Sequence, residues 1–281
     1  MNNRQIPQMS VTGSTTGRRK KSSWLIGIMI LLVALVIGSG IFVYYKYTER
    51  SQSTPVKSPT TTASGTPLAS MSAAQLYQYV LSKPPTLVDS LDGSHADNWN
   101  LYMQGDAGCQ FKNRALYVVV NLDQKSAFCF LRHEYLRDFA FQVQVQFGSV
   151  SDLDQFQNAG ILFRVHPVQQ KAYEFLMGRQ SLNVPGSSLV KDSASLDVLN
   201  SSVTELGSWS GGVPNNMTSP NVLTVIALQN KLSLYINSGL LDTVTDPTFQ
   251  GGKIGVEASD TFTVPEPPFE VAFRNMKLWA L

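Results

Sequence analysis

The stretch Asp138-Phe-Ala-Phe-Gln-Val-Gln-Val-Gln-Phe147 decides the fold class, because its side chains alternate between apolar and polar with a period of two. Every odd-numbered position from 139 to 147 is Phe or Val, and the even-numbered positions from 142 to 146 are Gln. Successive side chains of a β-strand point to opposite faces, so this stretch predicts a strand with one buried face. The glutamine ribbon, Gln142, Gln144 and Gln146, is either plain solvent-exposed surface or the lining of a ligand-binding face.

Short apolar segments of the same character continue toward the C-terminus and are separated by turn residues. Gln229-Asn230 predicts a tight hairpin between two of them, and Asn237-Ser-Gly239 predicts a turn after the second. Many short strands without alternating helices predict an all-β fold, an antiparallel sandwich of two sheets. The other predicted strands are Ala115–Asn121, Ala127–Leu131, Gly160–Val165, Ala172–Met177, Val222–Leu228, Leu232–Asn237, Lys253–Ala258 and Glu270–Leu281.

A hydrophobic segment near the N-terminus, Trp24 to Tyr45, predicts one transmembrane helix because it contains no charged side chain. At about 1.5 Å per residue it is long enough to cross a hydrocarbon core of about 30 Å. Arg18-Arg19-Lys20-Lys21 precedes it, so the positive-inside rule places the N-terminus in the cytoplasm and the C-terminal bulk outside. A cleaved signal peptide is the alternative, but its apolar region is usually about 7–15 residues long and ends at small residues.

The segments around this helix predict a simple domain organisation. Residues 1–23 are polar and basic, and we expect them to form a disordered cytoplasmic tail. Residues 46–70 are rich in Ser, Thr and Pro, which is typical of an extended stalk. Residues 86–281 then form the β-sandwich, which the predicted topology places outside the cell membrane.

A short helix is predicted between the stalk and the sandwich, within residues 71–85. Ser72 and Gln75 have the spacing of a capping box, so we expect the helix to cover about residues 73–82. Pro84-Pro85 ends it, since proline cannot continue a helix. We expect this helix to cover one end of the following domain.

The net charge of +2 hides an asymmetry along the chain. Residues 1–45 hold five basic side chains and no acidic one, which leaves 17 of the 22 basic residues against 20 acidic residues in the remainder. The predicted extracytoplasmic part is therefore mildly acidic and has no basic stripe that could neutralise phosphates. A nucleic-acid partner is not expected for the folded domain.

Short motifs in the later strands follow one another in a characteristic order. Gly160-Ile-Leu-Phe-Arg164 precedes Tyr173-Glu-Phe175, Leu232-Ser-Leu-Tyr-Ile-Asn237 precedes Gly251-Gly-Lys-Ile-Gly255, and Phe273-Arg-Asn-Met-Lys-Leu-Trp279 closes the series. This order resembles the concanavalin A-like lectin/glucanase jelly roll, in particular its laminin-G-like and 3-keto-disaccharide-hydrolase-like branch. The resemblance implies a jelly roll whose concave sheet or rim loops contact glycans or other surface ligands. Because the fold carries lectins, glycosidases and adhesion modules, the resemblance alone does not select among these functions.

The two cysteines, Cys109 and Cys129, lie in the consecutive strand candidates GCQFKN and AFCFL. Thiols outside the cytoplasm tend to pair, so we expect a disulfide. A closed loop of about 20 residues would stabilise the domain by about 3 kcal/mol in the chain-entropy relation. Two buried free thiols are the alternative. No further ligand with zinc-like spacing accompanies them, so no metal site and no cofactor is predicted.

No motif in the sequence predicts catalysis. A glycosidase needs two carboxyl groups about 5–9 Å apart, and neither an E-x-D-x-x-E pattern nor a G-x-S-x-G motif is present. Asp152 and Asp154 lie in a predicted turn, where they are either solvated or part of a calcium-binding loop. His95, His133 and His166 are scattered, and we expect them in loops or at strand ends.

Four residues are the candidates for ligand binding: Arg164, Tyr173, Glu174 and Trp209. Arg164 interrupts an apolar strand and Tyr173 and Glu174 lie on the next one, so an outer sheet face would present them to a sugar. Ordinary sheet chemistry is the alternative, with an Arg–Glu pair across the strands and a core tyrosine. Trp209 lies within residues 186–220, whose Ser, Gly and Asn content predicts a long loop, either functional or irregular with one anchoring Trp.

These observations together predict a membrane-anchored, extracytoplasmic, non-catalytic module that binds a carbohydrate or a surface polymer. A second hypothesis, an extracytoplasmic glycoside hydrolase of the 3-keto-disaccharide-hydrolase-like type, rests on the resemblance alone. A third hypothesis is a structural or sensory role beside an unknown membrane partner protein. The tail of residues 1–23 is too short to signal alone, so this role would act through the transmembrane helix.

Overall fold

The computed structural model describes residues 67–121, 123, 126–148, 157–166, 171–181, 184–192, 203–209, 217–260 and 268–281. All of them belong to one compact unit, Gly65–Leu281. Among these residues no helix is long and apolar enough to cross a membrane. The predicted cytoplasmic tail, transmembrane helix and most of the stalk lie outside the described residues, so they stay predictions.

The predicted short helix is present as α2, Ala73–Leu81. The Gln75 backbone N–H donates to the Ser72 hydroxyl, and the Ser72 backbone N–H donates to the Gln75 side chain, so the predicted capping box is confirmed. The helix is amphipathic and buries Leu76 and Val80 against the outer face of the larger sheet. It therefore covers one part of the domain surface, as its position in the sequence predicts.

Sixteen β-strands and two 3-10 turns, η1 and η2, accompany this helix in the described residues. Every strand predicted from the sequence is present, with ends displaced by a few residues. The elements are η1 Leu68–Ser70, β1 Leu87–Asp89, η2 Ala96–Asn98, β2 Trp99–Asn100, β3 Met103–Gln104, β4 Ala107–Lys112, β5 Ala115–Val120, β6 Ser126–Leu131, β7 Phe139–Phe147, β8 Asn158–His166, β9 Lys171–Ser181, β10 Val184–Asp192, β11 Val203–Trp209, β12 Asn221–Leu228, β13 Lys231–Ile236, β14 Gly239–Thr245, β15 Lys253–Ser259 and β16 Phe269–Ala280.

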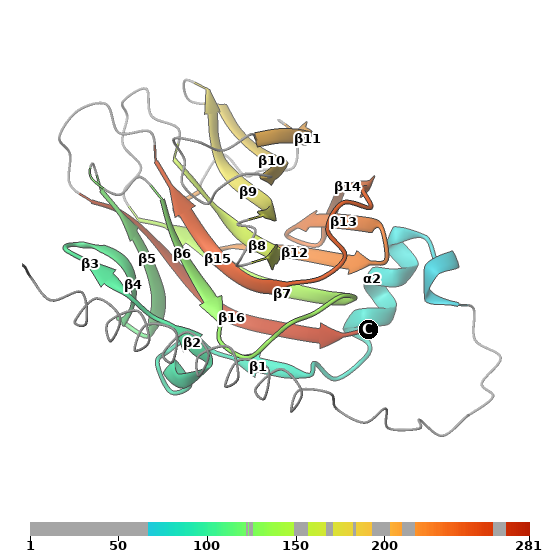
Figure 1. Cartoon of the computed structure of the whole chain (residues 1–281), viewed down its shortest axis with the longest axis horizontal. Coiled ribbons are helices and arrows are strands. Elements are labelled where there is room, and N and C mark those ends of the chain that lie inside the picture. The colour runs from blue at the N-terminus through green and yellow to red at the C-terminus, as the bar shows by residue number, and fades with distance from the viewer. Residues whose placement is uncertain are drawn as a thin grey trace, which may run out of the picture. The chain divides into compact units, whose positions relative to one another are not determined.

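The strands form two antiparallel sheets that pack face to face (Figure 1). The larger, nine-stranded sheet has the order β14-β13-β12-β7-β16-β5-β4-β3, with β1 paired to β16 beside it. The smaller, seven-stranded sheet has the order β11-β10-β9-β8-β15-β6-β2. Strands adjacent in a sheet are often distant in sequence, as in the pairing of β7 with both β12 and β16. This arrangement confirms the predicted all-β antiparallel sandwich.

The core lies between the two sheets and contains the apolar row of β7. Phe139, Phe141, Val143 and Val145 are 0% exposed and Phe147 is 2% exposed. The glutamines between them point to the outer face of the larger sheet and are half-buried. The predicted strand with one buried face is confirmed.

A disulfide joins the two sheets across this core. Cys109 lies on β4 of the larger sheet and Cys129 lies on β6 of the smaller sheet, with their Cα atoms 5.9 Å apart. Both side chains are buried among core residues. The predicted disulfide is therefore confirmed, and the structure adds that it crosses between sheets.

The prediction of a long loop over residues 186–220 is wrong for the part that the structure describes. Strand β10 pairs with β9 over nine positions, and β11 pairs with β10, so both extend the smaller sheet. Ser187 and Leu189 of β10 are buried. Strands β10 and β11 contain few apolar residues, so composition alone did not predict them. Pairing with a neighbouring strand of the sheet stabilises them instead.

Removal of the inter-sheet disulfide should lower the stability of the domain. The cysteines are separated by 20 positions, so the chain-entropy relation gives a loss of about 3 kcal/mol. For a domain of this size that corresponds to a melting temperature lower by about 6–12 °C. We expect this shift for Cys109→Ala/Cys129→Ala, measured by tryptophan fluorescence on the full-length protein in mild detergent.

Reduction provides the matched control for this variant. A reductant should lower the melting temperature of the wild type by a similar amount and leave the double variant unchanged. A double variant that melts together with the oxidised wild type would show that the cross-link does not stabilise the sandwich.

Candidate functional site

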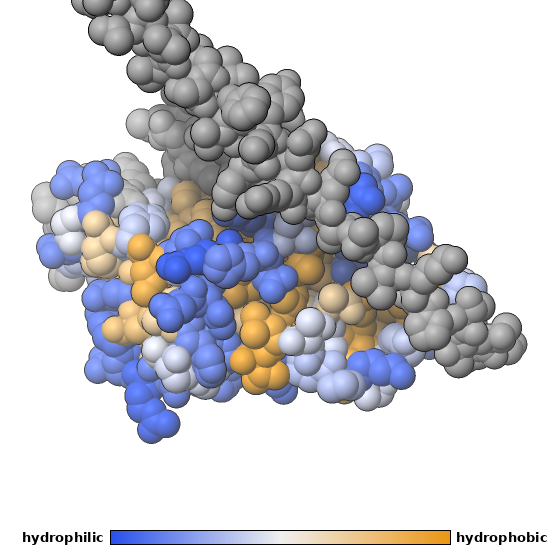
Figure 2. Space-filling view, turned by 60° about the horizontal axis from the view of Figure 1, so that its bottom comes forward, coloured by the Kyte–Doolittle hydropathy of each residue, from blue (hydrophilic) through white to orange (hydrophobic). Residues whose placement is uncertain are grey.

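The coloured part of the surface in Figure 2 is a mosaic of hydrophilic and hydrophobic patches rather than one broad apolar face. The candidate site is instead recognised by a group of polar side chains that lie close together. They line a groove of about 420 Å³ on the outer face of the larger sheet. Strand β7 contributes Gln142 and Gln144, β12 contributes Val222, β16 contributes Asn275 and Lys277, and β1 with the residue after it contributes Val88 and Ser90.

A β-bulge in β16 shapes this groove. The register between β16 and β7 shifts between Arg274 and Lys277, and Asn275 between them has a left-handed φ of 52°. Asparagine tolerates this conformation better than most residues. The Asn275 amide donates to Gln144 Oε1 at 2.7 Å, and its backbone N–H donates to Ser90 O at 3.2 Å. Bulges often re-aim side chains beside functional sites, so this irregularity is a second indication of a site.

Hydrogen bonds orient the other amides on the same face. Gln142 Nε2 donates to Thr224 Oγ1 at 3.1 Å. Gln146 Nε2 donates to Thr218 O at 2.9 Å, and its Oε1 accepts a hydrogen bond from Arg274 Nη1 at 3.1 Å. A primary amide has two donor hydrogens and an oxygen with two lone pairs. These bonds therefore fix the direction of the amides and leave hydrogen-bonding capacity for a ligand.

The acidic residue at the groove, Asp89, directs its carboxylate into the protein. Its Oδ1 accepts the backbone N–H of Leu91 at 2.8 Å, and its Oδ2 accepts Trp99 Nε1–H at 3.0 Å. The side chain is 1% exposed, and His95 Nδ1 lies 3.9 Å from Oδ1. Asp89 thus fixes the turn after β1 and the core tryptophan. The rest of the described lining is amide, hydroxyl, apolar and cationic.

Helix α2 covers the adjoining part of the same outer face. Its Tyr77 ring lies 4.5 Å from the ring of Tyr235, whose hydroxyl donates to Ala73 O at 2.8 Å. Burial raises the pKa of Tyr77 and raises the pKa of Tyr235 to about 12, so both phenols are neutral at physiological pH. The helix therefore packs on the outer face of the larger sheet next to the groove.

The structure places the predicted ligand-binding residue Arg164 inside the sandwich, where it is 0% exposed. Its φ of 51° and a register shift between Phe163 and His166 mark a bulge near the end of β8. The bulge interrupts the alternation of the strand, so Arg164 does not point to the outer face as strict alternation predicts.

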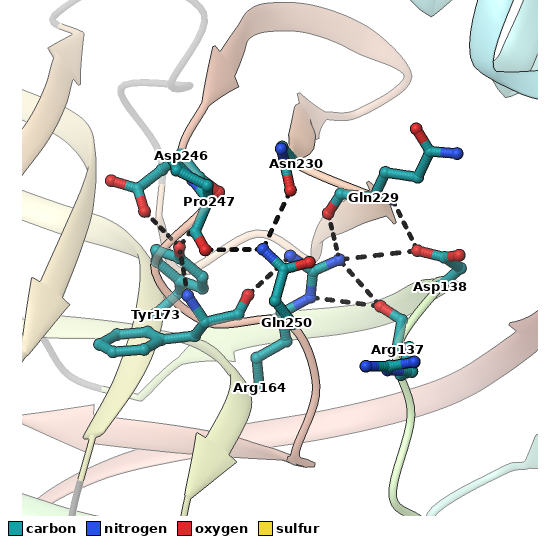
Figure 3. A network of polar contacts seen from close by, with 10 residues as sticks. Arg137, Asp138, Arg164, Tyr173, Gln229, Asn230, Asp246, Pro247 and Gln250 are labelled. Carbon is teal, nitrogen blue, oxygen red and sulfur yellow. Dashed lines mark hydrogen bonds and ion pairs between the residues drawn. The ribbon is translucent and has the colours of Figure 1, made fainter.

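The Arg164 guanidinium binds backbone carbonyl oxygens from three separate segments (Figure 3). It donates to Arg137 O at 3.2 and 2.9 Å, to Gln229 O at 2.7 Å and to Phe249 O at 2.9 Å. The Asp138 carboxylate lies 3.8 Å from it and accepts the Gln229 N–H at 2.6 Å. Burial lowers the pKa of Arg164, but a guanidinium has so high a starting value that it stays charged. We call this arrangement, which links the β12–β13 turn to the segments before β7 and β15, the arginine clasp.

Tyr173 lies beside the arginine clasp and is also fully buried. Its hydroxyl donates to Asp246 Oδ1 at 2.6 Å and accepts the Phe249 N–H at 3.2 Å. Asp246 also accepts from Lys191 Nζ at 3.0 Å and from the Thr248 N–H at 2.7 Å. Burial raises the pKa of Tyr173. Burial also acts to raise the pKa of Asp246, but the hydrogen bonds from Thr248, Tyr173 and Lys191 outweigh it and hold that pKa well below its usual range.

Glu174 and Trp209 lie elsewhere on the smaller sheet. Glu174 is half-buried on β9, opposite Leu162 of β8 and Val190 of β10. Trp209 ends β11 and packs, partly buried, against the core. None of the four predicted ligand-binding residues is among the described residues that line the groove, and their role in binding stays a prediction.

The sequence indicated the groove in part, through the outward glutamine ribbon. It gave no sign of Asn275 and Lys277, because a bulge brings them to that face. Among the described residues, no group of three or more His, Cys, Asp or Glu side chains is placed to hold a metal ion. Asp152 and Asp154, the alternative calcium loop, lie outside the described residues.

Comparison of the sequence with known protein families and with curated proteins gives no match. Among solved structures, a Bacillus licheniformis β-glucanase is similar with a TM-score of 0.50 at 9% identity, over 70% of this chain and 99% of that chain. A structure concerning endo-acting O-glycanases with which human gut microbiota initiate mucin breakdown has a TM-score of 0.50 at 11% identity, over 70% and 100%. The carbohydrate-binding module CBM66 from Bacillus subtilis has a TM-score of 0.49 at 11% identity, over 65% and 96%.

At such identities the likeness shows the fold alone. The described domain is a concanavalin A-like jelly-roll sandwich, the fold that the similar β-glucanase has. The resemblance seen in the order of strand motifs is thereby confirmed at the level of the fold. The choice between binding and catalysis depends on the chemistry of the site.

Replacement of Arg164 should destabilise the domain. Arg164→Met would leave three carbonyl groups without their charged donor, at a cost of about 3 kcal/mol or more. We expect a melting temperature lower by at least about 6 °C for the full-length protein. Arg164→Lys should recover a part of this loss, because an ammonium group lacks the planar fork that reaches several acceptors.

Arg137→Met is the matched control. Arg137 takes part in the arginine clasp through its backbone carbonyl oxygen, and its side chain is exposed. It should change stability by less than about 0.5 kcal/mol. An Arg164→Met protein that melts with the wild type would exclude a stabilising role for the arginine clasp.

Proposed function

We propose that this protein is a non-catalytic, membrane-anchored module that binds carbohydrate in the groove on its larger sheet. The observation that carries the proposal is the set of pre-oriented amides at the groove, Gln142, Gln144 and Asn275. The sandwich architecture is compatible with this role, but the lining of the groove is what favours it.

The chemistry of the lining suits a sugar. A sugar hydroxyl donates and accepts hydrogen bonds together, and a primary amide does the same. Val88, which is 56% exposed, and Val222 flank the amides and offer apolar contact to the C–H faces of a sugar ring. A volume of about 420 Å³ also falls within the roughly 300–1,000 Å³ that is common for small-ligand sites.

We also propose that the domain is displayed on the outer side of the cell membrane. Support comes from the uncharged apolar segment Trp24 to Tyr45 and from the basic cluster that precedes it. The disulfide between Cys109 and Cys129 adds support, since disulfides persist mainly in oxidising compartments.

Loss of the groove amides should reduce glycan binding. Gln142→Ala/Gln144→Ala removes hydrogen bonds worth about 1 kcal/mol each, so we expect affinity to fall about tenfold or more. Binding is measured by titration of the full-length protein, in mild detergent, against a panel of neutral and charged polysaccharides.

The control for the glutamine variants is Gln110→Ala. Gln110 is a half-buried glutamine on β4 of the same sheet and lies outside the groove lining. It should bind like the wild type, and each variant should keep a cooperative melting transition. Absence of binding across the panel, or equal binding by the wild type and the double variant, would contradict the proposal.

The membrane topology predicts how the protein fractionates. The full-length chain should stay with membranes during alkaline carbonate extraction, and deletion of residues 24–45 should release it. On intact cells, added protease should remove a tag at the C-terminus and spare a tag at the N-terminus. Extraction of the full-length chain by carbonate, or protection of the C-terminal tag, would exclude this topology.

A further inference from the structure

Two cations beside the groove have no carboxylate partner in the part of the chain that the structure describes. Lys277 is exposed, lies opposite Gln142 in the strand register and makes no hydrogen bond or ion pair there. Arg274 lies opposite Gln144, and its recorded hydrogen bond goes to the neutral amide oxygen of Gln146 at 3.1 Å. The strand β16 thus presents two positive charges along the row of amides.

Some other cations in the described part of the domain do have a carboxylate partner. On the larger sheet, Lys112 Nζ lies 2.6 Å from Glu270 Oε1, and on the smaller sheet, Lys191 Nζ lies 3.0 Å from Asp246 Oδ2. At the groove, the carboxylate of Asp89 is used inside the protein. Lys277 is therefore the exposed charge of the described lining, with Arg274 beside it, while the carboxylate of Asp89 is buried, although the chain after the predicted membrane segment is mildly acidic.

We propose that the groove binds an acidic glycan, whose sugar units carry carboxylate or sulfate groups. This inference rests on the proposed function and deepens it by assigning the charge class of the ligand. The amides bind ring hydroxyls, while Lys277 and Arg274 donate charge-assisted hydrogen bonds to the acidic substituents. A neutral glycan would leave both cations without a counter-charge.

The distribution of charge also determines where on the domain an acidic polymer is attracted and how it lies there. Negative charge elsewhere on the domain repels a polyanion, and the local positive charge of the groove attracts it. Lys277 and Arg274 lie on the same strand on either side of the bulge at Asn275. The acidic groups of a bound chain are therefore expected to follow the direction of β16.

The test compares polymers that share a backbone and differ in charge. The full-length protein in non-ionic detergent is titrated with polygalacturonate and its methyl ester, and with dextran sulfate and dextran. At low salt we expect at least one of the two acidic polymers to bind at least about tenfold more tightly than its neutral counterpart. The affinity of this acidic polymer should fall as the salt concentration rises. Comparison of the two acidic polymers distinguishes carboxylate from sulfate.

Single-residue variants locate the effect. Lys277→Gln should weaken binding of the acidic polymer about three- to fivefold, as expected for an exposed charge, and Lys277→Glu should weaken it further. Both should reduce the salt dependence. Lys231→Gln is the matched control, because Lys231 is an exposed lysine of the same sheet outside the groove, with one hydrogen bond of 3.4 Å to Ala69 O.

The outcomes separate this inference from the proposed function. Equal affinity for acidic and neutral polymers, with a loss in Gln142→Ala/Gln144→Ala, would overturn the charge class and keep carbohydrate binding. An equal effect of Lys277→Gln and Lys231→Gln would also overturn it, since attraction would then be diffuse. No binding to any glycan would overturn both. Thermal melting of each variant verifies that the fold is retained.

Discussion

The two-residue repeat of β7 is the constraint on which the rest of the structure depends. The row from Phe139 to Phe147 fills the space between the sheets, and pairing on both sides fixes the register of β12 and β16. The other row must face outward, which sets Gln142 and Gln144 beside the side chains of those two neighbours. A slip of one residue would exchange the rows and bury the amides in the core. The packing that forms the core therefore also forms the groove.

A buried cation joins segments that belong to both sheets. Desolvation of Arg164 is costly, and its hydrogen bonds to carbonyls of three segments offset that cost. Asp246 beside it has a folded-state pKa below its unfolded value near 3.8, so its contribution to stability is present above that value and is lost as the pH falls through the folded-state pKa. Neither residue lines the groove. The arginine clasp and the proposed binding groove thus use different side chains, which can be changed separately.

Local patterns predicted the strands that carry their own alternation, and β7 is the clearest case. The same patterns missed β10 and β11, because pairing of β10 with β9 and of β11 with β10, rather than composition, makes these segments strands. The orientations of the Arg164 and Asn275 side chains could not be predicted from the alternation, for one shared reason. Each lies at a bulge with a positive φ, and a bulge reverses the facing of the residues that follow it. The disulfide was predictable from compartment chemistry, but the placement of Cys109 and Cys129 on opposite sheets required the three-dimensional pairing.

The described lining of the groove suits the proposed binding role better than a role in glycoside cleavage. Cleavage needs two carboxyl groups about 5–9 Å apart, one of which must keep a proton near neutral pH. Among the described lining residues, Asp89 is the acidic one, and Leu91 and Trp99 occupy its oxygens. The nearby cations, Lys277 and Arg274, would lower the pKa of any acid beside them and oppose a role as proton donor. The same cations support the proposal that the ligand is an acidic glycan, whose charged groups would lie along β16.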